Sequence, residues 1–251
     1  MHDIDGDPLF RSILHEATVD PATLGIILHG SRSVGMEDGE SDYDVIRVLT
    51  EERFAARLAH GLPRGEVIWP ENRKAELYVT SPSDLSGPAT PDWFKRGLGT
   101  ACVLLDKTGA VQALLDELTA LPNDRLAEQT AELFDAYLNG FYRSLKAARR
   151  GNEVGARLEA AESLADLVQL LFALEGRIAP YHSRLPAVLD RLAAQGWEPG
   201  ELQQRFLSIL RTGGIRPQQE LEERVERLLR DRGYGYVVEG WEGEIERVKA
   251  F

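Results

Sequence analysis

Two aspartates, Asp42 and Asp44, stand two residues apart, directly before the apolar run VIRVL at residues 45–49. Residues two apart on a β-strand project from the same face, so the pattern predicts two neighbouring carboxylates. Because like charges repel, we expect a positive group to lie between them. Paired carboxylates are preferred ligands of Mg²⁺, which often links them to the phosphates of a substrate. An isolated Asp-x-Asp is more often a solvated turn. The neighbouring residues must therefore show whether a metal site is the better interpretation.

A loop of small residues precedes the aspartates and follows the apolar run LGIIL at residues 24–28. A glycine in such a loop lets a phosphate approach the backbone closely, and the exposed N–H groups suit an anion. The residues expected to contact phosphates are Gly30, Ser31, Arg32 and Ser33. Arg32 has the alternative role of a surface charge, as does Lys74, a further candidate for a phosphate contact.

The elements that would hold these residues mix strands and helices in the first half of the chain. Apolar runs predict strands at residues 24–30, 43–50, 66–69, 75–80 and 100–106, and helices at 7–20, 51–62 and 109–121. The segment 81–93 is rich in Pro, Ser and Gly and is expected to be a loop.

A boundary signal, LPND, follows at residues 121–124, and the chain after it is dominated by amphipathic helical patterns. The tail at 234–251 is ambiguous between helix and strand. We therefore expect an α+β chain: a domain at residues 1–121 with a mixed sheet and flanking helices, then a helical bundle at 122–251.

The order strand, Gly-Ser, short linker, Asp-x-Asp, strand resembles the nucleotidyltransferase superfamily of the polymerase-beta type. The matching residues are Gly30-Ser31 and the run from Ser41 to Asp44, followed by VIRVL. This resemblance implies transfer of a nucleoside monophosphate from a nucleoside triphosphate, with release of pyrophosphate. It further implies that the Gly-Ser turn holds the triphosphate and that the aspartates hold Mg²⁺, with two ions expected. ATP is the expected donor, and the other nucleoside triphosphates stay open.

The superfamily also uses a third carboxylate from a later strand, for which Glu76 in the run AELYVT is the best candidate. Its position resembles the third acid of the aminoglycoside adenylyltransferases that modify streptomycin and spectinomycin, which implies that it helps to deprotonate the acceptor. A sugar hydroxyl is a poor nucleophile and needs such assistance. Glu66 is the weaker alternative, and an exposed strand residue is the plain structural reading of Glu76.

The same antibiotic-modifying enzymes carry a helical C-terminal domain, which implies that the helical half takes part in acceptor binding. Glu159, Glu162 and Asp166 are spaced by three and four and would share one helix face. Such an acidic stripe would attract a cationic aminoglycoside, although a solvated charged face is an equally good reading. Arg184, beyond this helix, is a candidate for a triphosphate contact.

The composition limits the alternatives. The net charge of −12 disfavours nucleic acid as a partner, and the single cysteine, Cys102, excludes an internal disulfide and a cysteine-based zinc site. No apolar run reaches the length of a membrane span, and the start MHDIDGDPLF lacks the features of a signal peptide. We therefore expect a cytoplasmic protein without a membrane partner.

Three functions are compatible with these patterns. The first is a Mg²⁺-dependent nucleotidyltransferase that transfers AMP to a hydroxyl of a small molecule, for example an aminoglycoside. The second is an adenylyltransferase that acts on a protein or RNA, and the third is a non-catalytic nucleotide-binding module. A fused toxin ribonuclease with an Arg-x₅-His motif is disfavoured, because Gly176 stands six residues before His182.

Overall fold

The computed structural model describes residues 7–68 and 74–251, and it confirms the expected α+β class with a mixed sheet. The five strands are β1 (Thr23–His29), β2 (Tyr43–Leu49), β3 (Gly65–Ile68), β4 (Ala75–Thr80) and β5 (Cys102–Asp106). Their order across the sheet is β3-β4-β2-β1-β5, with β2 and β4 parallel and the other neighbours antiparallel. Residue 69, the last of the predicted strand 66–69, lies outside the described residues.

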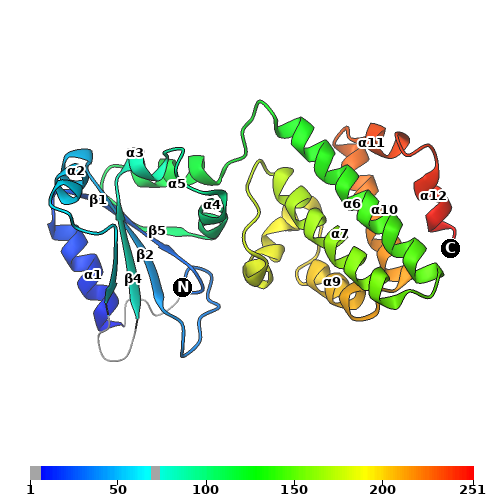
Figure 1. Cartoon of the computed structure of the whole chain (residues 1–251), viewed down its shortest axis with the longest axis horizontal. Coiled ribbons are helices and arrows are strands. Elements are labelled where there is room, and N and C mark those ends of the chain that lie inside the picture. Colours follow the sequence, from blue (N-terminus) through cyan, green and yellow to red (C-terminus); the bar gives the residue numbers. More distant parts are fainter. Residues whose placement is uncertain (1–6, 69–73) are drawn as a thin grey trace. The chain divides into compact units, whose positions relative to one another are not determined.

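Helices cover both faces of this sheet (Figure 1). They are α1 (Pro8–Val19), α2 (Glu51–Ala59), α3 (Pro82–Leu85), α4 (Asp92–Leu98) and α5 (Ala110–Thr119). The apolar stripe of α1 and Phe54 of α2 pack on the face that carries Val45. Leucines of α3, α4 and α5 pack on the opposite face, which carries Ile46. Burial on both faces explains why β1 and β2 read as continuous apolar runs.

The start of α1 is tied directly to β2. Asp7 caps the helix by accepting a hydrogen bond from the Leu9 N–H at 3.0 Å, and Pro8 occupies the first turn, where its missing N–H costs nothing. The buried hydroxyl of Tyr43 donates to the same carboxylate at 2.5 Å, and the Tyr43 ring stacks on Phe10. These contacts fix the beginning of β2, the point where the two aspartates stand.

The segment 81–93, expected to be a loop, contains the short helix α3 and the start of α4. Ser81 caps α3 by accepting from the Asp84 N–H at 3.4 Å, and Pro82 again begins the helix. The Pro and Ser residues that suggested a loop here are therefore helix-start residues, and the expectation of a continuous loop was wrong.

The second half is helical, as expected, and the ambiguous tail at 234–251 forms helices as well. Its elements are α6 (Leu126–Arg149), α7 (Glu153–Ala173), η2 (His182–Arg184), α8 (Leu185–Val188), η3 (Leu189–Gln195), α9 (Glu201–Thr212), α10 (Ile215–Asp231), α11 (Gly235–Glu239) and α12 (Glu244–Lys249). The long helices α6 and α7 lie side by side (Figure 1). They approach closely at Gly140, where a β-carbon would come 2.9 Å from Cβ of Ser163.

The chain divides into two compact units. One comprises the described residues up to Ala120 together with Pro180–Val188, and the other comprises Leu121–Ala179 and Leu189–Phe251. The short segment 180–188, which the sequence division places in the helical half, thus belongs with the sheet. Among the described residues, no helix combines the length and apolar character needed to cross a bilayer.

Candidate active site

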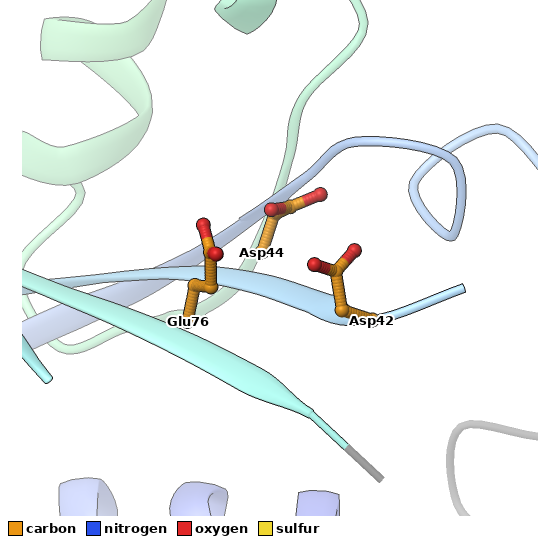
Figure 2. A group of neighbouring side chains, drawn as sticks. All are labelled: Asp42, Asp44 and Glu76. Atoms are coloured by element: carbon orange, nitrogen blue, oxygen red, sulfur yellow. The ribbon is translucent and has the colours of Figure 1, made fainter. Parts of the chain in front are cut away.

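The register between two parallel strands brings the predicted acids together. Asp44 of β2 is the direct partner of Glu76 of β4, and Asp42 immediately precedes β2. One carboxylate oxygen from each of Asp42, Asp44 and Glu76 lies within 4.8 Å of the others, among the residues that the structure describes. Figure 2 shows the three side chains rising from the same side of the two strands. The structure therefore assembles a compact group of three carboxylates, while their catalytic role stays a prediction.

The alternative third acid, Glu66, does not join this group. Its direct partner on β4 is Leu77, which faces the side of the sheet covered by α1, opposite to Glu76. Its carboxylate forms an ion pair with Arg57 of α2 instead. The period of two along a strand explains why Glu76 lies at the site and Glu66 does not.

The glycine of the small-residue loop has a steric role beside the acids. Gly30 follows β1 with a φ of 77°, and a β-carbon there would lie only 1.9 Å from Oδ2 of Asp44. Only glycine combines this backbone conformation with room for the carboxylate. The Gly30 carbonyl accepts a hydrogen bond from the Ser33 hydroxyl at 2.9 Å, which closes the loop.

The residues that follow Gly30 form a closed turn. The Ser31 carbonyl accepts from the N–H groups of Val34 at 3.2 Å and Met36 at 3.1 Å, so this stretch is a turn. Gly35 also has a positive φ, 70°, which interrupts any helical continuation. Backbone N–H groups of a turn can still bind an anion, so the turn is compatible with the predicted phosphate contacts, which remain predictions.

Arg32 contributes to the architecture of the loop. Its guanidinium donates to the carbonyls of Ser41 at 2.7 Å and Asp42 at 3.0 Å, and its Cζ lies 4.1 Å from the centre of the Tyr43 ring. The side chain thus joins the beginning of the loop to the residues just before β2. These bonds already use part of the guanidinium, and no contact tests its predicted role in binding phosphate.

The positive group expected among the acids is Lys74. Its Nζ lies 3.3 Å from Oδ2 of Asp42, and it forms an ion pair with Glu76. The expected position was between Asp42 and Asp44, whereas the ammonium lies between Asp42 and Glu76. Hydrogen bonds to both carboxylates raise the pKa of Lys74, so the ammonium stays charged at neutral pH.

The electrostatics of Asp44 reflect its crowded place. Burial raises its pKa to about 6, and the charges of Asp42 and Glu76 act in the same direction, while Arg184 and Lys74 oppose them. Without a metal ion, the folded protein therefore tolerates the charged form of Asp44 poorly. A divalent cation would relieve this repulsion.

Of two residues near the acids, the sequence did not indicate His29 at all, and it indicated Lys74 only as a possible phosphate contact or surface charge. His29 is the register partner of Asp44 on β1, and burial lowers its pKa to about 4, which keeps its ring neutral at physiological pH. Its place as the last residue of β1, directly before Gly30, was the signal available. Lys74 stands two residues before Glu76, so the spacing was the signal that the two share one face of the sheet.

Arg184 reaches this site through the segment 180–188. The Tyr181 hydroxyl donates to the Trp93 carbonyl at 2.7 Å, and the Tyr181 ring lies against Gly97 of α4. The charge of Arg184 acts on both Asp44 and His29. The predicted triphosphate residue therefore lies in the electrostatic neighbourhood of the carboxylates, while its contact with a nucleotide is untested.

The predicted acceptor residues lie on α7 of the other unit. Glu159 and Glu162 share one cation, Arg143 of α6, at 2.8 Å and 3.4 Å. Burial and the charge of Glu162 raise the pKa of Asp166. The acidic stripe exists on one helix face, but part of its charge is balanced within the protein.

Comparison with known proteins adds little beyond this geometry. A family model described as a domain of unknown function (DUF4037) matches residues 98–184, less than half of the chain. No curated protein matches. Among solved structures, the chain is similar to a nucleotidyltransferase-like protein from Exiguobacterium sibiricum 255-15, with 17% identity and a TM-score of 0.34 over 87% of this chain and 76% of that chain. The three carboxylates and Gly30 lie outside the matched family segment.

Proposed function

We propose that this chain is a metal-dependent nucleotidyltransferase that transfers a nucleoside monophosphate, AMP from ATP, to a hydroxyl of a small molecule. The observation that carries the proposal is the convergence of Asp42, Asp44 and Glu76 beside a positive-φ glycine loop. Carboxylates that can hold a metal, and a turn whose backbone N–H groups can bind phosphate oxygens, are the two parts that nucleotidyl transfer requires.

The donor set fits Mg²⁺, because all three groups offer hard oxygen ligands and none offers sulfur or imidazole. Asp42 and Asp44 are the residues that would hold the metal, and Glu76 completes the group. Bound Mg²⁺ supplies positive charge that offsets the charge developing on the phosphates.

The protein residues then have separate tasks. The acceptor oxygen forms a bond to the α-phosphorus, while the bond from the α-phosphorus to the leaving pyrophosphate oxygen breaks. Glu76, half-exposed at the rim of the group, would accept the proton of the hydroxyl. The loop N–H groups from Gly30 to Ser33 and the Arg184 guanidinium would bind the triphosphate.

A cationic, hydroxylated acceptor such as an aminoglycoside is the substrate class that we propose within this activity. The acidic stripe of Glu159, Glu162 and Asp166 supports it, since an amine-rich ligand could replace Arg143 as the counter-ion. The net charge of −12 favours cationic over anionic acceptors generally.

The test is release of pyrophosphate in Mg²⁺ with each of four nucleoside triphosphates and a panel of aminoglycosides that includes streptomycin and spectinomycin. We expect release that depends on one acceptor, and its loss in the Asp42→Asn/Asp44→Asn double variant. Glu76→Gln should lose activity, whereas Glu66→Gln, a matched change on the other face of the sheet, should retain it. Nucleotide binding without release for any acceptor would argue for a protein acceptor or a non-catalytic module.

A further inference from the structure

The ammonium of Lys74 lies among the carboxylates, where a bound metal ion would also lie. Asp42 and Lys74 immediately precede the paired residues Tyr43 and Ala75, so they lie side by side as Asp44 and Glu76 do two residues later. The Tyr43 N–H donates to the Lys74 carbonyl at 2.9 Å, which fixes this arrangement. Three carboxylates and one ammonium thus occupy the four corners of a two-strand patch.

The ammonium engages the oxygens that a metal would need. It lies 3.3 Å from Oδ2 of Asp42 and forms an ion pair with Glu76, and its charge also lowers the pKa of Asp44. A metal bound to the same group would take carboxylate oxygens as ligands at about 2.0–2.1 Å, so its charge would stand beside the ammonium and repel it.

We propose that Lys74 is a resident counter-ion of the carboxylate group, which holds the acids together without metal and must be displaced when a divalent cation binds. This inference rests on the proposed function, because it assumes that the group binds a metal. The lysine has the means to leave: its side chain is 32% exposed and its four-carbon stem is flexible. Metal affinity is then set by competition between a tethered monovalent cation and a free divalent one.

The competition predicts opposite effects of one substitution. Lys74→Met removes the competing charge, so the affinity for Mn²⁺, used as the probe, should rise by about fivefold or more. The same change leaves three carboxylates without their counter-ion, so the unfolding temperature in EDTA should fall. Addition of Mn²⁺ should therefore raise the unfolding temperature of Lys74→Met by more than that of the wild-type protein.

A matched control is available on α4. Lys95 has a side-chain exposure of 31%, close to that of Lys74, and its Nζ lies 3.7 Å from Oδ1 of Asp92. Lys95→Met makes the same change of charge away from the carboxylates, and it should bind Mn²⁺ like the wild-type protein. Lys74→Arg keeps the charge and should retain the weaker affinity.

Isothermal titration of Mn²⁺ into the 251-residue chain, with circular dichroism to verify folding, decides between the outcomes. Equal or weaker Mn²⁺ binding by Lys74→Met would overturn the role of Lys74 and leave the metal site intact. Absence of Mn²⁺ binding in the wild-type protein, Lys74→Met and Asp44→Asn alike would instead remove the metal site on which the proposed function depends. If Lys74→Met does not fold, Lys74→Gln in the same titration carries the test.

Discussion

Gly30 and Asp44 lie so close that a β-carbon on residue 30 would come 1.9 Å from Oδ2 of Asp44. The φ of 77° at Gly30 adds a second reason for glycine, since L-residues rarely adopt it. The glycine of the loop and the acid of the following strand are therefore one steric unit, and a change at either should disturb the other.

The first prediction is that Gly30→Ala weakens Mn²⁺ binding at least tenfold, because the new methyl group displaces the Asp44 carboxylate. The left-handed backbone should also lower the free energy of unfolding by about 1–2 kcal/mol. Gly61→Ala is the control: Gly61 has a φ of 70°, but a β-carbon there would meet no atom within 4 Å. It should lose similar stability and keep metal binding, and equal Mn²⁺ affinities in both variants would contradict the steric link.

The second prediction concerns Asp44→Asn without metal. Since the folded pKa of about 6 exceeds the ordinary 3.8, the unfolded state loses its proton first, and the charged group destabilises the fold as pH rises through this range. In EDTA at pH 7.5, Asp44→Asn should therefore unfold with a free energy roughly 1 kcal/mol higher than wild type, allowing for solvent screening.

The difference should shrink at pH 4, where Asp44 is largely protonated in the folded state. Urea unfolding at the two pH values measures it. Asp42→Asn serves as the comparison. It removes one of the repelling charges but breaks the 3.3 Å contact with Lys74, so its free energy of unfolding should rise by less than that of Asp44→Asn. A loss of stability in Asp44→Asn at pH 7.5 would show that the repulsion is not the dominant effect there. The variant should lose nucleotidyl transfer in either case.

Local patterns in the sequence predicted the strands and placed Asp42 and Asp44 on one face, whereas Glu76 was added through the resemblance to the nucleotidyltransferase superfamily. The apolar run at 75–80 predicts that side chains alternate between the two faces of β4, but only the observed pairing of β4 with β2 and β3 separates Glu76 from Glu66. The register itself is a property of the folded sheet, because it depends on contacts between segments distant in the chain. The sequence could therefore name Glu66 as an alternative but could not exclude it.

Long-range placement was the part that local patterns could not predict. Tyr181 is 88 residues from Trp93, whose carbonyl it binds, and no local pattern encodes that pairing. The segment 180–188 consequently appeared to belong with the helical half. The partners of Arg32 and Lys74 were equally difficult to predict. The sequence does not distinguish a positive side chain that binds oxygens of the protein from one that binds a phosphate.

The third prediction tests Arg184. Removal of its guanidinium in Arg184→Ala should raise KM for the nucleoside triphosphate about tenfold, as expected for loss of a charge-assisted hydrogen bond to phosphate. Tyr181→Phe, which removes the 2.7 Å bond that anchors this segment, should change KM in the same direction by a smaller factor. Steady-state kinetics with varied triphosphate measures both.

Arg216→Ala is the control for Arg184→Ala, because Arg216 has an 87% exposed side chain paired with Glu220 in the other unit. Its KM should equal that of wild type. An unchanged KM in Arg184→Ala would show that the guanidinium serves the electrostatics of Asp44 and His29 without contacting the nucleotide.

The fourth prediction concerns a buried acid in the helical unit. Glu222 of α10 has an exposed fraction of 0% and forms an ion pair with Lys249 of α12. Burial raises its pKa to about 7 in spite of Lys249, and the charges of Glu226 and Glu223 act with burial. Burial and the charge of Glu222 together raise the pKa of the Tyr137 hydroxyl, so this buried tyrosine lies near the carboxylate.

Because the folded pKa of Glu222 exceeds the ordinary 4.5, its protonated form favours the fold. The free energy of unfolding should fall by about 1–3 kcal/mol as pH rises from 4.5 to 7, where the unfolded state loses its proton first. Because Asp44 contributes a slope of its own over this range, the comparison is made in the Asp44→Asn background. There Glu222→Gln should remove this slope, whereas Glu223→Gln, an exposed neighbour on the same helix, should keep most of it, because burial is the larger cause. Urea unfolding followed by circular dichroism at pH 5, 6, 7 and 8 measures the slopes. A slope that persists in Glu222→Gln would assign the pH dependence to other groups, and the Lys249 ion pair would then hold Glu222 in its charged form.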